Sequence, residues 1–73
     1  RAFIYAGAQD VLCTLWPVAD ESTKALMTAF YENLAQGQAV EEALRGAQAA
    51  LAAKPETRHP FFWAGFVAVR GPE

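Results

Sequence analysis

The sequence predicts an α/β fold, and three observations point to that class. Residues 11–16 read V-L-C-T-L-W, an uncharged run that is typical of a strand covered on both faces. Two segments with apolar residues at helical spacing follow, and a second uncharged run, F-F-W-A-G-F-V-A-V, occupies residues 61–69. Strands interleaved with helices indicate a sheet on which helices pack.

The composition limits the size and the class of the protein. The 73 residues make at most one small domain, and 53% of them are hydrophobic against 19% charged. A small chain with this much apolar surface is expected to bury part of it against the rest of a longer protein or against a second copy of itself. We therefore expect the isolated chain to form a homo-oligomer. The net charge is −2 and the six basic residues are scattered, which argues against nucleic acid as a partner.

Residues 1–8, R-A-F-I-Y-A-G-A, are compatible with a helix but lack a capping residue before them. They are therefore predicted to be the tail of a helix, with Gly7 at its C-terminus. This abrupt beginning suggests that the chain is part of something longer.

The strand of residues 11–16 is predicted to run directly into a helix. Pro17 has no amide hydrogen and stops the sheet ladder, and Asp20 can then accept amide hydrogens as the N-cap of the next helix. In open α/β sheets ligands bind outside the carboxyl ends of strands, so this junction is the first place to look for function.

Two helices and a final strand complete the prediction. The first helix follows Asp20 and ends at Gly37, and the second runs from Val40 to about Ala53 with a mostly alanine stripe. Residues 54–60, K-P-E-T-R-H-P, are a breaker segment, and residues 61–69 form the second strand, in which Gly65 marks a bulge or a close backbone approach. The predicted order is helix tail, strand, helix, helix, strand.

Five blocks in this order resemble the C-terminal part of CHAT domains. They are A-F-I-Y-A-G-A-Q-D-V, L-W-P-V-A-D-E-S-T, L-M-T-A-F-Y-E-N-L, E-A-L-R-G-A-Q-A-A-L and H-P-F-F-W-A-G-F-V. The resemblance covers residues 1–73 and implies part of a caspase-like three-layer α/β/α sandwich, in the clan of caspases, separase and gingipains. It also implies a bacterial parent protein with tetratricopeptide repeats, and a His–Cys protease dyad that lies upstream of these residues.

Within these residues, Cys13 and His59 are the only candidates for cysteine protease chemistry. Cys13 lies inside a strand with no cationic neighbour and matches an ordinary core position of the family, whereas His59 lies in a charged loop. We therefore predict no catalytic residue in this chain. One Cys and one His do not make a metal site, so no metal and no cofactor are expected. With no signal segment and no long apolar run, we expect a cytoplasmic protein without a membrane partner.

Three residues at the junction are candidates for substrate binding: Trp16, Asp20 and Glu21. The segment L-W-P-V-A-D is similar to one in separase, where an acidic residue helps to bind the basic side chain before the scissile bond. The resemblance thus implies that Asp20, with Glu21 beside it, favours Arg or Lys. Asp20 as a plain N-cap and Trp16 as a core residue are the alternatives. Ala19 stands where many family members carry a second Asp, which weakens the inference.

Two functions remain open on the sequence. In the first, the chain supplies pocket wall and scaffold to a cysteine endopeptidase whose reactive residues lie elsewhere. In the second, it belongs to a non-catalytic interaction or assembly module, a degenerate CHAT domain whose last strand pairs with a partner.

Overall fold

A three-stranded sheet and two helices make up the computed structural model, which describes residues 2–7 and 9–70. The strands are β1 (Ala2–Ala6), β2 (Asp10–Thr14) and β3 (Phe66–Arg70). The helices are α1 (Asp20–Ala35) and α2 (Val40–Ala52), and two short 3-10 turns, Pro55–Thr57 and Pro60–Phe62, lie between α2 and β3. The predicted α/β class is confirmed.

The sheet has the order β1-β2-β3, and both pairings are antiparallel. The central strand β2 places Cys13 between Phe3 of β1 and Val67 of β3, and Val11 opposite Val69. The pairing of β1 with β2 is irregular between Phe3 and Tyr5. Because β2 has a partner on each side, its backbone is the best anchored part of the sheet.

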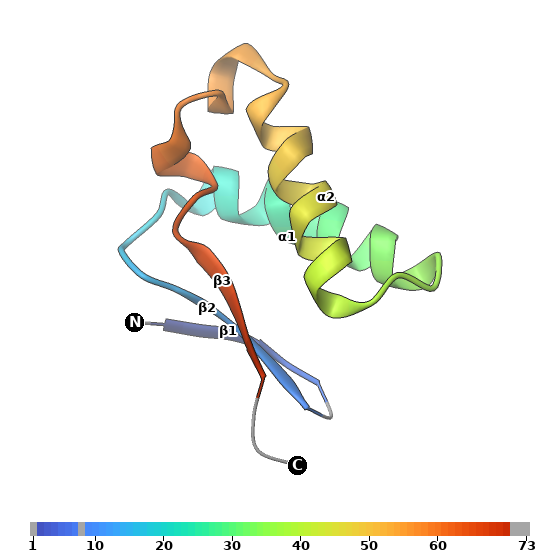
Figure 1. The fold of residues 1–73 in the computed structure, drawn as a ribbon. Helices are drawn as coiled ribbons and strands as arrows, with labels where there is room; N and C mark the ends of the chain where they lie inside the picture. The colour runs from blue at the N-terminus through green and yellow to red at the C-terminus, as the bar shows by residue number, and fades with distance from the viewer. Residues whose placement is uncertain (1, 8, 71–73) are drawn as a thin grey trace.

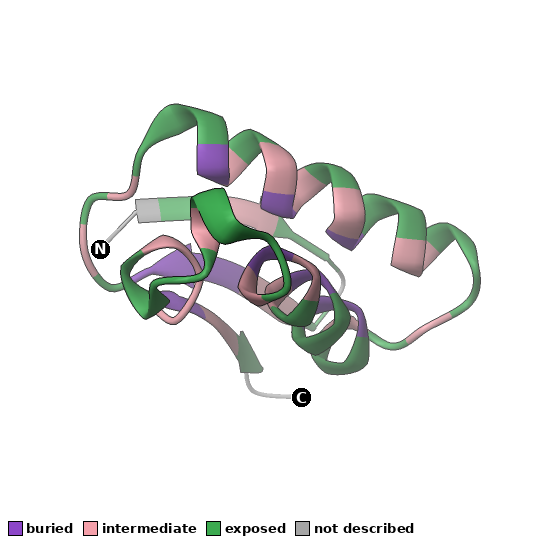
Figure 2. Cartoon of the chain, turned by 90° about the horizontal axis from the view of Figure 1, so that it is seen from above, coloured by how far each residue is buried: buried purple, intermediate pink, exposed green. Residues whose placement is uncertain are grey.

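Both helices pack on one face of this sheet (Figure 1). Leu12 and Phe66 point from the sheet into the core, and the buried positions of α1 lie on the side that faces the sheet (Figure 2). The helices contribute the remaining fully buried apolar residues of the core, which are Leu26, Phe30, Ala43, Leu44, Ala47 and Leu51. The described chain is therefore a two-layer structure, one sheet layer and one helix layer.

The two helices were predicted within a residue or two. α1 closes where Gly37 adopts a φ of 92°, a left-handed conformation that a residue without a Cβ takes readily. The antiparallel return is held by Asn33, whose amide nitrogen donates to the carbonyl oxygen of Ala43 over 3.0 Å. On the predicted alanine stripe of α2, Ala43 and Ala47 are fully buried in the core.

The predicted helix tail at residues 1–8 is wrong. Residues Ala2–Ala6 form strand β1, and Arg1 and Ala8 lie outside the described residues. The aromatic and β-branched side chains of Phe3, Ile4 and Tyr5 suit a strand as well as a helix. Pairing with β2 decides the conformation, and the hairpin is closed by the Gly7 amide, which donates to the Asp10 carbonyl over 2.8 Å.

The predicted final strand at residues 61–69 is too long at its start. Its first residues belong to the 3-10 turn Pro60–Phe62, and β3 begins only at Phe66. Pro60 sets the first φ of the turn, and the His59 imidazole caps it by accepting the Phe61 amide at Nδ1 over 3.1 Å. The close approach expected at Gly65 is present, since the Trp16 indole lies against it. Residues 71–73, which follow β3, lie outside the described residues.

The expected cover on both faces is present at the middle of β2, where Leu12 on the helix side and Cys13 on the other side are both fully buried, but the helices cover only one face of the sheet. We call the side of the sheet away from the helices the open face; by the strand register its side chains are those of Phe3, Ala6, Val11, Cys13, Val67 and Val69. Phe3 is 71% exposed and Val69 44% exposed. The three-layer arrangement would need further chain on this face. Across the part of the chain that is described, neither helix is both long and apolar enough to cross a bilayer.

Candidate functional site

The connection from β2 to α1, residues 15–19, forms a fixed corner at one end of the sheet (Figure 1). It begins where the Leu15 amide donates to the Gly65 carbonyl over 2.8 Å, a bond that continues the β2–β3 pairing past the end of both strands. It ends at Ala19, which has an extended backbone and precedes the first turn of α1. The corner carries the three predicted substrate-binding residues within or directly after it.

Trp16 is held by contacts to residues that come 45 or more positions later. Its Nε1–H donates to the Phe61 carbonyl over 3.1 Å, and its ring stacks on the Phe61 ring with 6.3 Å between centroids and 18° between planes. The indole also lies against Gly65. Trp16 is half-buried rather than part of the main core, so one portion of the aromatic surface remains accessible at the corner.

Asp20 is not the N-cap that the sequence predicted. The N-cap is Ala19, which offers no side-chain hydrogen bond, and Asp20 is the first helical residue and is exposed. The turn is instead tightened by Ser22, whose hydroxyl donates to the Ala19 carbonyl over 3.0 Å. Asp20 thus lies exposed in the first turn of α1, next to backbone amides that have no partner within the helix.

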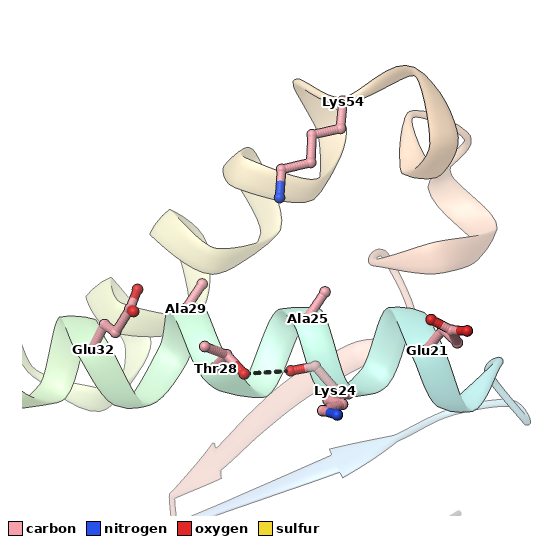
Figure 3. A pocket seen from close by; sticks show the side chains of 7 residues that line it. All are labelled: Glu21, Lys24, Ala25, Thr28, Ala29, Glu32 and Lys54. Atoms are coloured by element: carbon pink, nitrogen blue, oxygen red, sulfur yellow. Dashed lines mark hydrogen bonds between the residues drawn. The ribbon is translucent and has the colours of Figure 1, made fainter.

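Glu21 lies at one end of an open hollow of about 440 Å³ along α1 (Figure 3). In the figure Ala25 and Ala29 form its floor and point toward Lys54, which follows α2, while Glu32 marks the far end. Lys24 and Thr28 complete the lining, and the Thr28 hydroxyl donates to the Lys24 carbonyl over 2.9 Å. The hollow thus has an apolar floor and a rim of mixed charge.

A second hollow of about 300 Å³ adjoins the first and shares Glu21, Ala25 and Lys54 with it. Its other lining residues are Ser22, Leu51, Glu56 and Thr57. Trp16 and Asp20 line neither of these two hollows. The structure therefore places the three predicted residues on one corner without enclosing them in a common pocket.

Cys13 and His59, the candidate nucleophile and base, differ in burial and lie on different elements. Cys13 is fully buried in the middle of β2, between Phe3 and Val67. His59 is exposed before the turn Pro60–Phe62, and its Nδ1 accepts the Phe61 amide. A nucleophile must reach its substrate, and the Cys13 thiol has no access to solvent. Within residues 2–7 and 9–70, no three His, Cys, Asp or Glu side chains gather in a way that could hold a metal ion.

Gln48 is a structural anchor that sequence reasoning missed. Its side-chain nitrogen donates to the Trp63 carbonyl over 2.7 Å and to the Phe66 carbonyl over 3.0 Å, so α2 holds the segment that leads into β3. A polar residue directly after Ala47 on the buried stripe of α2 is the signal that could have indicated such a role. Gln48 holds the same segment on which Trp16 rests.

Comparison with known proteins gives relatives and a family. The chain is 41% identical to the human tetratricopeptide repeat protein 28 and 39% identical to its mouse counterpart, in each case over 69 residues that make up 94% of this chain. It spans only 3% of the length of these curated relatives. No solved structure matches it. The sequence model of one family, described as the CHAT domain, matches residues 1–71, and the chain therefore belongs to the CHAT domain family.

Proposed function

We propose that this chain is the C-terminal portion of a CHAT domain in a longer protein, and that it supplies the substrate-side wall and scaffold of a caspase-like cysteine endopeptidase. Its β2–α1 corner presents Asp20, with Trp16 and Glu21 beside it, to a basic side chain of the peptide. The catalytic His and Cys come from a part of the domain outside these residues. By analogy with the names of its relatives, the longer protein also carries tetratricopeptide repeats.

The observation that supports this function best is the state of Asp20. It is exposed at the first position of α1 and does not serve as the N-cap, so helix capping does not explain the carboxylate. An exposed carboxylate suits a guanidinium or ammonium group, which a charged hydrogen bond would hold, and the half-buried Trp16 ring lies four residues earlier in the chain. The exposed Asp20 therefore supports the proposed preference for Arg or Lys.

The test is Asp20→Ala in the active longer protein. Cleavage after Arg or Lys should fall about tenfold or more in kcat/KM, because a hydrogen bond to a charged group contributes roughly 1.5–3 kcal/mol. Cleavage of a matched peptide with an uncharged norleucine should change little. Glu42→Ala, which removes an exposed carboxylate in the first turn of α2 that lines neither hollow, is the control and should leave both rates unchanged.

Two outcomes would count against the proposal. If Asp20→Ala lowers the melting temperature but leaves selectivity intact, the residue acts only on the helix. If the longer protein lacks a His and a Cys at strand ends upstream, or cleaves neither peptide, the endopeptidase function itself is lost.

A non-catalytic interaction module is the second candidate, and the open face of the sheet favours it. Phe3 and Val69 expose apolar surface there, and the described part of the open face carries no charged side chain. Such a surface fits a protein partner as well as an internal cover. Binding of that partner by a longer protein with a substituted catalytic Cys would separate this function from proteolysis.

A further inference from the structure

The indole of Trp16 rests on a position that only glycine can occupy without a shift. A Cβ built on Gly65 would lie 2.7 Å from Cε2 of Trp16, 2.9 Å from Cζ2 and 3.0 Å from Cδ2. These atoms belong to a rigid ring, not to the end of a flexible chain, so the indole would have to move as a whole. Gly65 is buried and has no positive φ, so the requirement is one of space and not of backbone conformation.

The same short segment holds the corner in three further ways. The Gly65 carbonyl accepts the Leu15 amide, the Phe61 carbonyl accepts the Trp16 Nε1–H, and the Phe61 ring stacks on the indole. A displaced indole could not keep the last two contacts. The corner therefore has one well-defined position as long as residue 65 lacks a side chain.

The segment is in turn fixed from the helix layer. Gln48 of α2 donates to the carbonyls of Trp63 and Phe66, which stand on either side of Gly65 in the sequence. The Trp63 indole adds a bond from its Nε1–H to the Arg58 carbonyl over 3.1 Å. Because Gly65 is held on both sides, a Cβ at this position cannot be accommodated by moving the segment, and the Trp16 side has to move.

We infer that Gly65 is a positioning residue of the proposed substrate wall: it sets the place of the Trp16 indole and, through it, the start of α1. Only residues 17–19 separate Trp16 from Asp20, and the first of them, Pro17, has a fixed φ. A shift of the indole is therefore transmitted to Asp20 and Glu21. The consequence for substrate selectivity rests on the proposed function, whereas the positioning itself rests on the contacts above.

The first experiment measures hydrogen exchange by mass spectrometry in the longer protein that contains this chain. In Gly65→Ala, the amides of residues 15–23 should exchange about tenfold faster. The reason is that two hydrogen bonds are loosened, from the Leu15 amide to the Gly65 carbonyl and from the Thr23 amide to the Ala19 carbonyl. Gly37→Ala is the matched control. Its positive φ makes alanine costly there, but no atom lies within 4 Å of the added Cβ, so residues 15–23 should be unaffected.

The second experiment asks whether Gly65 acts through Trp16. In a Trp16→Ala background the added Gly65→Ala should produce no further increase in exchange, because the clashing ring is gone. In the protein with Trp16, Gly65→Ala should lower the preference for an arginine peptide over its citrulline analogue about tenfold. A purely structural glycine would lower both rates together and leave the ratio unchanged.

The outcomes separate the two proposals. Unchanged exchange at residues 15–23, or an equal effect of Gly65→Ala in both backgrounds, overturns the positioning inference whatever the enzyme does. Faster exchange with an unchanged peptide preference overturns the link to selectivity. If the longer protein cleaves neither peptide, the proposed function fails and the exchange measurement alone decides the positioning. Should Gly65→Ala not fold, Phe61→Leu, which removes the stacked ring at a half-exposed position, must raise the same exchange for the inference to hold.

Discussion

Ala19 begins α1 without a side chain that can cap it. Its backbone is extended, with φ −61° and ψ 141°, which is the conformation in which a serine hydroxyl accepts an amide of the first turn. The first turn of α1 therefore lacks a side-chain cap, and the Asp20 carboxylate is exposed beside it. A capping side chain at residue 19 should therefore increase the stability of the fold.

Ala19→Ser should stabilise the chain by about 1 kcal/mol, because the hydroxyl satisfies an amide that has no partner at present. For a domain of this size the melting temperature should then rise by roughly 4–8 °C, as followed by circular dichroism. Ala35→Ser, an exposed alanine at the end of α1 where no amide needs a cap, is the control and should give no increase. An equal rise in both variants would contradict a capping effect.

How far the site residues could be predicted depended on the distance of their partners along the chain. The acidic pair after the strand was visible because a strand end, a proline and carboxylates follow one another within residues 11–21. The contacts of Trp16 could not be predicted in this way, because Phe61 and Gly65 come 45 and more residues later and approach Trp16 only when the sheet has formed. Pattern within one segment predicts a residue's place but not its long-range contacts.

At the scale of elements, helical periodicity over more than ten residues was decisive and short apolar runs were not. α1 and α2 each repeat apolar residues over several turns; α2 begins at the predicted Val40, and α1 begins at Asp20, one residue before its predicted start. The five residues of β1 are too few to show a period, and their pairing with β2 decides their conformation. The start of β3 was missed because the 3-10 turn Pro60–Phe62 is as apolar as the strand that follows.

Gln48 offers a test of how much one side chain contributes to joining α2 and β3. Gln48→Met keeps the length of the side chain but leaves the Trp63 and Phe66 carbonyls without this donor. The loss should lower the free energy of unfolding by about 1–3 kcal/mol, measured as a shift of the urea midpoint at constant slope. Gln36→Met, at an exposed glutamine after α1, should change the free energy of unfolding by less than about 0.5 kcal/mol. A midpoint unchanged in Gln48→Met would show that water replaces the amide fully.

For the whole molecule, the open face is the main surface without a cover. Three strands of five residues, at about 3.4 Å per residue and 4.8 Å between strands, give a face of roughly 240 Å². A stable dimer buries about 800 Å² per partner, so a second copy stacked on this face alone would be held weakly. Further chain of the same protein needs less contact, because it is always at high local concentration.

Because a second copy and further chain of the same protein would cover the open face differently, one substitution on it, Val69→Lys, should have a different effect in the isolated chain and in the longer protein. In the isolated chain the added charge should reduce concentration-dependent association in sedimentation velocity, since two copies would bring like charges together. In the longer protein the same lysine should lower the melting temperature if further chain covers the face, because burying the charge is costly. Ala49→Lys, at an exposed position of α2 away from the open face, should change neither measurement. A longer protein that tolerates Val69→Lys has an uncovered face, and that result would favour the interaction module over the three-layer endopeptidase.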